Sequence, residues 1–357
     1  MLSNYFTNPK MRSPSDKDIS LDERNRLVQI AKDKLASSKE SYRWNANIQG
    51  AVLQLRTNNY HLYDFWVENW YAAPRTQKVL PHGLMYAVTG VEGMEPHAYY
   101  HHDTKTAIFI NTDYYGQCKS WALGIATDIM EVQHGINSIH GSCAVIGGRG
   151  VVLIAPTGTG KTTHTFGLLE LPDSKIHSDD WIFVTVKKGL AIAKISERKF
   201  YVRSDLVKSF PEYRKIFDLS KCENVADGDY TKFGNSRVIF DPEWIGGPEK
   251  FVEEAVINNV ILLRRDKESP PEVKLGVDEA LDILEEGRYQ VLSGAGANEG
   301  SFSNEPFYNP YLLMVRRANQ RKFFKDLLGV AECHIMNTGV ETVEETQARI
   351  RRVIKPV

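Results

Sequence analysis

The sequence predicts an α/β protein in which an N-terminal α/β domain precedes a nucleotide-binding domain with a mixed sheet. Two observations lead to this fold class. Short apolar runs of strand length alternate with segments of helical periodicity along most of the 357 residues. One such run, residues 150–155, leads into a glycine-rich turn and then a helical pattern. That arrangement is typical of phosphate-binding α/β domains.

The composition indicates a soluble globular chain in which positive and negative charges nearly balance. Hydrophobic residues make up 42% and charged residues 25%, and 44 Lys and Arg against 45 Asp and Glu give a net charge of −1. Nothing in this balance recruits nucleic acid or an anionic membrane, so any polyanion site must be local. The four cysteines form no CxxC pair, and the N-terminus has no apolar leader. We expect a cytoplasmic protein with no nucleic-acid or membrane partner.

The first part of the chain divides into a polar arm, residues 1–18, and an α/β domain, residues 19–135. The arm contains two prolines and is expected to be loose. Ser20 opens a capping box, which predicts the start of a helix. Strand-like runs follow, broken by an aromatic segment at residues 60–71. This segment either packs in the core or lines an acceptor pocket.

Residues 136–357 are predicted to form the nucleotide-binding domain. Two strands joined by a glycine turn precede the glycine-rich loop, and a β-hairpin follows it, which favours a mixed sheet over a purely parallel one. Residues 204–232 are rich in charge and are expected to be a helical insertion. A strand, a helix, a second glycine-rich loop at residues 293–300 and a final helix–strand–helix unit complete the domain.

The phosphate-binding loop reads APTGTGKTT. It departs from the strict pattern only at its first position, where alanine replaces glycine. Its glycines let backbone N–H groups face phosphate oxygens, its lysine neutralises the β- and γ-phosphates, and the threonine after the lysine binds Mg²⁺. The alternative is an ordinary glycine-rich connection. We assign nucleotide binding to Thr157, Gly158, Thr159, Gly160, Lys161, Thr162 and Thr163, with Thr162 also a metal ligand.

Two adjacent acids, Asp179 and Asp180, follow the loop, the second of them 19 residues after Lys161. A bound nucleotide needs a carboxylate for its metal, and a hydroxyl acceptor needs a base. We therefore expect one aspartate, assigned as Asp180, to bind the metal and the other to orient or deprotonate the acceptor. The alternative is a pair of solvated turn residues.

Several separate stretches, in the same order along the chain, resemble the nucleotide-dependent phosphoenolpyruvate carboxykinase family. The central part also resembles the HPr kinase/phosphorylase family. The resemblance runs from about residue 50 onward and implies a P-loop kinase core shared by both families. The stretches are DYYGQCKSWALG through SIHGSCAVIG, APTGTGKTT, SDDW, ERKFYVR, NSRV, NVILLRRDKESPPEVKL and HIMNTG.

The resemblance also implies further site residues. Glu197 would be another acid of the cleft, Arg203 would stand at a phosphate-binding position, and Arg237 would bridge the transferred phosphoryl group and the acceptor. Fixed guanidinium groups suit a transition state that spreads charge over the phosphoryl oxygens. Without the resemblance, both arginines would be interpreted as surface ion-pair residues.

His140 stands where carboxykinases bind a transition metal together with a lysine and an aspartate, and where HPr kinases have a histidine without that metal. Counted without gaps, the lysine position falls on Trp121, whose indole N–H cannot bind a cation; the nearby basic residue is Lys119. The arm stretch RSPSDKD, from Arg12, resembles a carboxykinase stretch whose arginine holds oxaloacetate. For His140, a core histidine is the alternative.

These observations favour a kinase that uses ATP, or a related nucleoside triphosphate, with Mg²⁺ to phosphorylate a hydroxyl of a small molecule or a protein serine. A carboxykinase ranks second, because neither its metal lysine nor its carboxylate clamp can be placed. A nucleotide-binding regulatory protein without turnover ranks third, because both aspartates and both arginines are present. The sequence leaves open the acceptor, the donor nucleotide and the oligomeric state.

Overall fold

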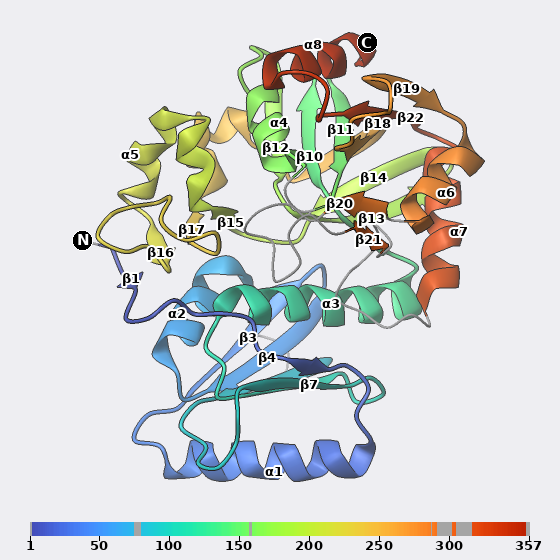
Figure 1. The fold of residues 1–357 in the computed structure, drawn as a ribbon. Coiled ribbons are helices and arrows are strands. Elements are labelled where there is room, and N and C mark those ends of the chain that lie inside the picture. The colour runs from blue at the N-terminus through green and yellow to red at the C-terminus, as the bar shows by residue number, and fades with distance from the viewer. Residues whose placement is uncertain are drawn as a thin grey trace.

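The computed structural model describes residues 2–74, 80–156, 159–286, 288–290, 302–304 and 316–354. Its described part is α/β, as predicted, with helices covering several sheets of mixed strand direction (Figure 1). No helix in those ranges combines the length and apolar character that crossing a bilayer requires. The second glycine-rich loop, residues 293–300, and Thr157 and Gly158 of the first loop lie outside the described residues.

The N-terminal sheet has seven strands in the order β2-β7-β8-β6-β4-β3-β5. Strands β4, β6 and β8 run parallel to one another, and the others add antiparallel or edge pairings. The strands are β2 (Ser15–Asp16), β3 (Tyr42–Ile48), β4 (Ala51–Thr57), β5 (Tyr71–Ala72), β6 (Gly83–Val88), β7 (His97–His101) and β8 (Thr106–Ile110).

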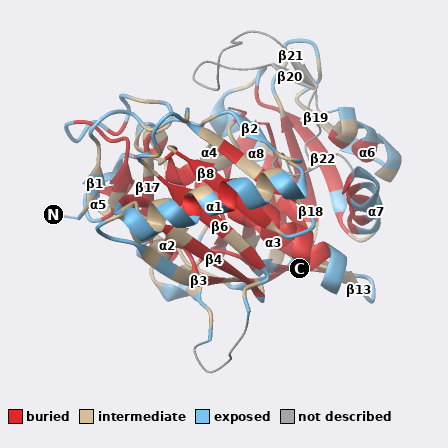
Figure 2. Ribbon diagram, turned by 90° about the horizontal axis from the view of Figure 1, so that it is seen from below, coloured by how far each residue is buried: buried red, intermediate tan, exposed pale blue. Residues whose placement is uncertain are grey.

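Helix α1 (Leu21–Ser37) covers one face of this sheet, and helices α2 (Tyr60–Asn69) and α3 (Tyr115–His134) cover the other. The Ser20 half of the predicted capping box is confirmed, because the Ser20 hydroxyl accepts the backbone N–H of Glu23 at 3.2 Å, whereas the Glu23 carboxylate binds Arg26. Figure 2 shows α1 with its outer face exposed and the strands behind it buried. Phe65 and Trp66 of α2 are fully buried, so the aromatic segment packs in the core.

The C-terminal domain is built on a nine-stranded mixed sheet, as the hairpin pattern predicted. Its main path runs β12-β10-β11-β18-β14-β13-β9, with β22 and β19 attached beyond β18. The parallel pairs β11/β18 and β18/β22 form its centre, and β10/β11 and β13/β14 are antiparallel hairpins. The strands are β9 (Asn137–His140), β10 (Ser142–Ile146), β11 (Arg149–Ile154), β12 (Ser174–Ser178), β13 (Trp181–Lys187), β14 (Leu190–Ile195), β18 (Glu254–Arg264), β19 (Glu272–Leu275) and β22 (Glu332–Asn337).

Helices pack on both faces of this sheet. Helix α4 (Lys161–Leu168), which follows the phosphate loop, lies with α8 (Val343–Val353) on one face. Helices α6 (Val277–Glu286) and α7 (Arg317–Leu328) pack on the other. The final helix–strand–helix unit that the sequence predicted is α7, β22 and α8. A short hairpin of β20 (Arg288–Gln290) and β21 (Phe302–Asn304) lies apart from the sheet.

The expected helical insertion is only partly helical. Residues 204–232 contain two short 3-10 segments, η1 (Ser204–Lys208) and η2 (Pro211–Tyr213), one turn of α-helix, α5 (Arg214–Phe217), and a strand, β16 (Lys221–Glu223). Strand β16 joins β15 (Phe200–Arg203), β17 (Arg237–Phe240) and β1 (Asn4–Tyr5) in a small sheet of order β1-β16-β17-β15. Charge patterning did not reveal this strand because it is only three residues long and one of its partners, β1, is distant in sequence. Two more 3-10 segments follow, η3 (Pro242–Ile245) and η4 (Pro248–Lys250).

The polar arm is not loose. Strand β1 pairs with β16 of the insertion, and β2 pairs with β7 of the N-terminal sheet. Between these strands, the backbone N–H of Lys10 donates to the Asn224 side chain at 2.7 Å, and the Asn224 amide donates back to the Lys10 carbonyl at 2.9 Å. The arm therefore ties the insertion to the N-terminal domain, which the polar composition alone did not predict.

Helix α3 lies where the two domains meet (Figure 1). Every residue from Tyr115 to Glu131 is buried, because one face packs on the N-terminal sheet and the other meets the C-terminal domain. Its side chains can therefore reach the C-terminal domain from below the phosphate loop. Lys119, near the start of α3, does so.

Candidate functional site

Two connections between strands bring His140 and Asp180 together. Strand β9 continues into β10 through Gly141, and β12 continues into β13 through Asp179 and Asp180. Because β13 pairs with β9, Trp181 lies opposite His140, and the Gly141 N–H donates to the Asp180 carbonyl at 3.0 Å. A Cβ atom at Gly141 would lie 2.8 Å from the Leu153 carbonyl oxygen, so this close approach needs glycine.

Asp180 is the centre of a cluster of basic side chains, two lysines and a histidine. One carboxylate oxygen, Oδ1, lies 3.0 Å from Nζ of Lys161 and 3.2 Å from Nε2 of His140, and the other lies 3.0 Å from Nζ of Lys119. Burial would raise the pKa of Asp180, but Lys119 and Lys161 outweigh it and hold that pKa well below its usual value. Asp180 is therefore ionised at neutral pH. Its side chain is 29% exposed, so a metal ion can reach it.

Asp179, although adjacent in sequence, has the opposite electrostatic environment. The residue is only 4% exposed, and among the described residues no group hydrogen-bonds to its Oδ1 atom. Burial, together with the negative charges of Asp180 and Glu197, raises the pKa of Asp179 to about 7. The two acids therefore differ in charge state, with an ionised Asp180 and an Asp179 that can exchange a proton near neutrality, and their separate roles stay a prediction.

Lys119 belongs to this site, which corrects the interpretation that Trp121 occupies the lysine position. The Lys119 side chain is 4% exposed, and its Nζ lies 3.0 Å from Asp180 and 3.1 Å from Glu197. Burial opposes its charge, but Glu197 and Asp180 prevail and raise the pKa of Lys119 above its usual value. Trp121 packs instead in the N-terminal core, with its ring centroid 5.2 Å from that of Phe109. Lys119 and Trp121 are two positions apart on one helix, so their side chains point about 200° apart and only one of them can face the cleft.

His140 is also part of this cluster rather than a core histidine. Burial and the positive charge of Lys161 lower the pKa of His140, and the bond to Asp180 only partly offsets them. The neutral imidazole is therefore the favoured form at neutral pH. A neutral imidazole beside an ionised carboxylate can accept or donate a hydrogen bond, or supply one metal ligand.

Arg203 and Arg237 are neighbours on paired strands, since they stand opposite each other in the β15/β17 register. Arg203 makes a two-point ion pair with Asp205, at 3.1 and 2.7 Å, as the ion-pair alternative expected. Arg237 donates to the carbonyls of Gly234 and Ser236 at 3.2 and 2.9 Å. The fold thus places Arg203 and Arg237 side by side on paired strands. Their phosphate-binding role remains a prediction.

The described part of the phosphate loop is held from two sides. The Thr338 hydroxyl, after the end of β22, donates to the Thr159 carbonyl at 3.0 Å. Gly160 has a left-handed φ of 99°, and α4 begins at the next residue, Lys161. The Thr165 hydroxyl donates to the Lys161 carbonyl at 2.8 Å. The first turn of α4 is therefore fixed, with its unpaired backbone N–H groups as a potential anion site.

A Mg²⁺–nucleotide complex fits this donor set. The ionised Asp180 faces the loop lysine, and Thr162 and Thr163 are partly exposed in the first turn of α4. Within the described ranges, no group of three His, Cys, Asp or Glu side chains is arranged to hold a metal ion. Mg²⁺ commonly binds through one or two protein ligands and completes its shell with phosphates and water. Asp180 and Thr162 are the residues that would hold it.

Glu197 and the residues behind it were only partly foreseen. Glu197 is buried and holds Lys119, as a cleft acid would. Asn69 of α2, which donates to Glu197 at 3.0 Å, was missed, because nothing local distinguishes it from other asparagines. Lys119 carried a signal, since it is a lone lysine in an otherwise apolar helical stretch.

Comparison with known proteins leaves the family open. No protein-family model matches the sequence, and no curated protein matches it significantly.

Proposed function

We propose that the protein is a nucleotide-dependent kinase that transfers the γ-phosphoryl group of ATP to a hydroxyl of a small molecule or a protein serine. One observation carries the proposal. A buried carboxyl whose pKa is raised to about 7, Asp179, stands next to an ionised carboxylate, Asp180, that faces the lysine of a phosphate loop. Base, metal ligand and phosphate-binding cation are the three parts that this reaction needs.

Nucleotide binding would rearrange the ion pairs around Asp180. Lys161 lies 3.0 Å from Asp180 and would turn to the β- and γ-phosphates when they enter. Asp180 would keep Lys119 and His140 as partners and offer an oxygen to Mg²⁺. The bound metal would neutralise charge on the phosphates. The positive end of α4 adds to the same attraction.

Asp179 would act as the general base. As the acceptor oxygen bonds to the γ-phosphorus, its proton passes to the Asp179 carboxylate, and the bond from the γ-phosphorus to the β–γ bridging oxygen breaks to release ADP. A base with a pKa near the working pH is both deprotonated often enough and basic enough to be effective. Arg203 and Arg237 are the groups expected to stabilise the charge on the transferred phosphoryl group.

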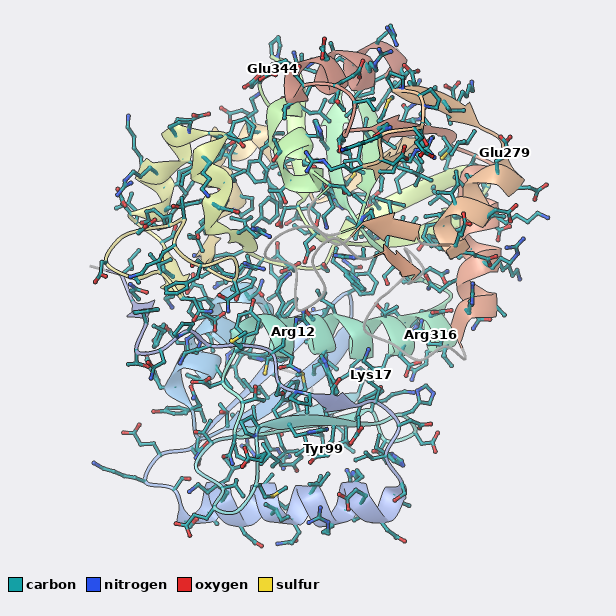
Figure 3. All side chains as sticks on the ribbon, viewed as in Figure 1. Arg12, Lys17, Tyr99, Glu279, Arg316 and Glu344 are labelled. Atoms are coloured by element: carbon teal, nitrogen blue, oxygen red, sulfur yellow. The ribbon has the colours of Figure 1, made fainter. Side chains whose placement is uncertain are left out.

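A carboxykinase remains the second candidate, and two contacts favour it. Lys119 and His140 both contact Asp180, and a lysine, a histidine and an aspartate are the residue types that the carboxykinase metal site requires. Arg12 of the arm donates to the Ser120 hydroxyl at 3.3 Å, one residue from Lys119. Figure 3 shows Arg12 beside α3, at the level where the two domains meet. Arg12 is therefore close enough to Lys119 to bind the carboxylate of a substrate at this site.

The deciding experiment incubates the wild-type protein with γ-labelled ATP, Mg²⁺ and mixtures of metabolites, and then identifies the labelled products. A parallel coupled assay, with Mn²⁺ and ATP/ADP or GTP/GDP, follows oxaloacetate formation and decarboxylation. A phosphorylated hydroxyl compound that Lys161→Ala does not produce supports the kinase. Oxaloacetate turnover supports the second candidate, and nucleotide binding without any product would contradict both.

A further inference from the structure

We propose that Asn69, on helix α2 of the N-terminal domain, is a positioning residue that holds Lys119 in place through Glu197. This inference rests on the proposed function, because it concerns the same cluster around Asp180. Within the described part of the chain, the Asn69 side chain hydrogen-bonds to Glu197, Lys199 and Tyr115 and not to Lys119 or Asp180, so its influence would pass through the Glu197 carboxylate.

The Asn69 side chain is fully buried, and its hydrogen bonds need an amide. Its Nδ2 group donates to Oε1 of Glu197 at 3.0 Å and to the Lys199 carbonyl at 2.9 Å. Its Oδ1 atom accepts the Tyr115 hydroxyl at 2.8 Å. An ionised aspartate has no donor, so at this position it would place an oxygen against two acceptors, Oε1 of Glu197 and the Lys199 carbonyl. The contacts therefore select asparagine over its isosteric acid.

The backbone around Asn69 is fixed against the same segment of the C-terminal domain. The Arg198 N–H donates to the Asn69 carbonyl at 2.8 Å, and the Arg198 guanidinium donates to the Glu68 and Val67 carbonyls at 2.8 and 3.2 Å. Carbonyls at the end of a helix have no hydrogen-bond donor within that helix, and here Arg198 supplies the donors. The end of α2 and Glu197 therefore lie in a defined relation to each other.

Glu197 passes this constraint to the catalytic cluster. Its Oε1 atom accepts from both Asn69 and Lys119, the latter at 3.1 Å, and Lys119 continues to Asp180 at 3.0 Å. Burial raises the pKa of Glu197, while the charge of Lys119 and the Asn69 hydrogen bond oppose that rise. Asn69 thus helps to keep Glu197 ionised, and an ionised Glu197 shares Lys119 with Asp180.

Asn69→Asp should disturb the cluster in a specific way. Two carboxyl groups facing each other in a buried site cannot both ionise readily, so one takes up a proton. Lys119 then loses part of its attraction to Glu197 and pairs more strongly with Asp180. It therefore competes with Mg²⁺ for the Asp180 carboxylate. We expect the acidic limb of the pH–rate profile to move to higher pH by about one unit, and the Mg²⁺ concentration for half-maximal rate to rise several-fold.

The experiment compares four proteins: wild type, Asn69→Asp, Glu197→Gln and the double variant. Asn58→Asp is the matched control, because the Asn58 amide bonds Thr89 and Ser38, outside the cluster. If Asn69 acts through Glu197, Asn69→Asp should add little to the effect of Glu197→Gln, so the two changes should be clearly non-additive. Additive effects, an unshifted pH profile for Asn69→Asp, or the same shift for Asn58→Asp would overturn the inference.

Two further measurements keep the test decisive. Serine is shorter than asparagine and introduces no charge, so a folded Asn69→Ser protein should show a smaller fall in rate and a smaller shift in pH profile than Asn69→Asp. If the wild type transfers no phosphoryl group, the proposed function fails, but urea unfolding still tests the link. Asn69→Asp should then destabilise the protein more at about pH 8 than at about pH 5, because a carboxyl pKa raised in the folded state costs stability as pH rises. Glu197→Gln should remove most of that pH dependence, and its persistence would refute the role of Glu197.

Discussion

Replacing Asp179 by asparagine should stabilise the protein at alkaline pH while abolishing phosphoryl transfer. Asp179 is buried beside Asp180 and Glu197, and its pKa is raised from 3.8 to about 7. The folded protein therefore holds a proton on Asp179 at pH values where the unfolded chain has released it. Asparagine has nearly the same shape and carries no charge, so it removes the cost of ionising this group in the folded state.

The magnitude follows from the size of the shift. A group whose pKa is raised in the folded state contributes stability that is complete below its unfolded pKa and is lost as pH rises through its folded pKa. Here the loss falls between about pH 4 and pH 7. A rise of about 3 units, at 1.36 kcal/mol per unit, amounts to about 4 kcal/mol. Between about pH 5 and pH 8, where most proteins stay folded, the expected change is about 3 kcal/mol.

The assay is urea unfolding of the wild type and Asp179→Asn at both pH values, followed by tryptophan fluorescence and far-ultraviolet circular dichroism. The free energy of unfolding of the variant, relative to wild type, should rise by about 3 kcal/mol from the lower to the higher pH. Phosphoryl transfer should be lost at both. An equal pH dependence for the two proteins would refute the raised pKa, and a variant that retains wild-type turnover would refute the role of Asp179 as base.

Three other predictions concern residues around Asp180. Lys161→Ala should weaken Mg²⁺–ATP binding on the order of tenfold or more by removing charge from the β- and γ-phosphates; isothermal titration calorimetry checks this, and unchanged affinity would contradict the loop assignment. Asp180→Asn should lower turnover at least about tenfold and raise the Mg²⁺ requirement, which a metal titration of the rate measures; normal metal dependence would show that Asp180 is not a ligand. Oxaloacetate turnover is expected to be absent, and a rate on the order of 10 s⁻¹ that Lys119→Met abolishes would instead establish the carboxykinase reaction.

Local features of the chain could be predicted from the sequence because they depend on residues only a few positions apart. The cap at Ser20, the hairpin of β13 and β14 and the turn joining β10 to β11 all formed as the local patterns indicated. The phosphate loop is of the same kind, since its glycines, lysine and threonine are consecutive. The sequence therefore determined these local elements, and it predicts a phosphate site at the loop.

The tertiary structure decided which side chains complete the site. The choice between Lys119 and Trp121 depends on how α3 is rotated between two domains, and an ungapped count along the sequence cannot determine that rotation. The polar arm likewise found its partners about 80 and 220 residues away, in β7 and β16.

The clearest case is the pair Asp179 and Asp180. In the sequence they are two identical residues in one turn, and only their neighbours distinguish them. Lys119 from α3 and Lys161 from α4 reach Asp180 and lower its pKa, whereas Asp179 is enclosed without a hydrogen-bond partner for its Oδ1 atom among the described residues, and its pKa rises. Burial and charges brought in by the fold create that difference, because the energy of a carboxylate depends on the solvent and on all the charges around it, most of which come from residues distant in sequence.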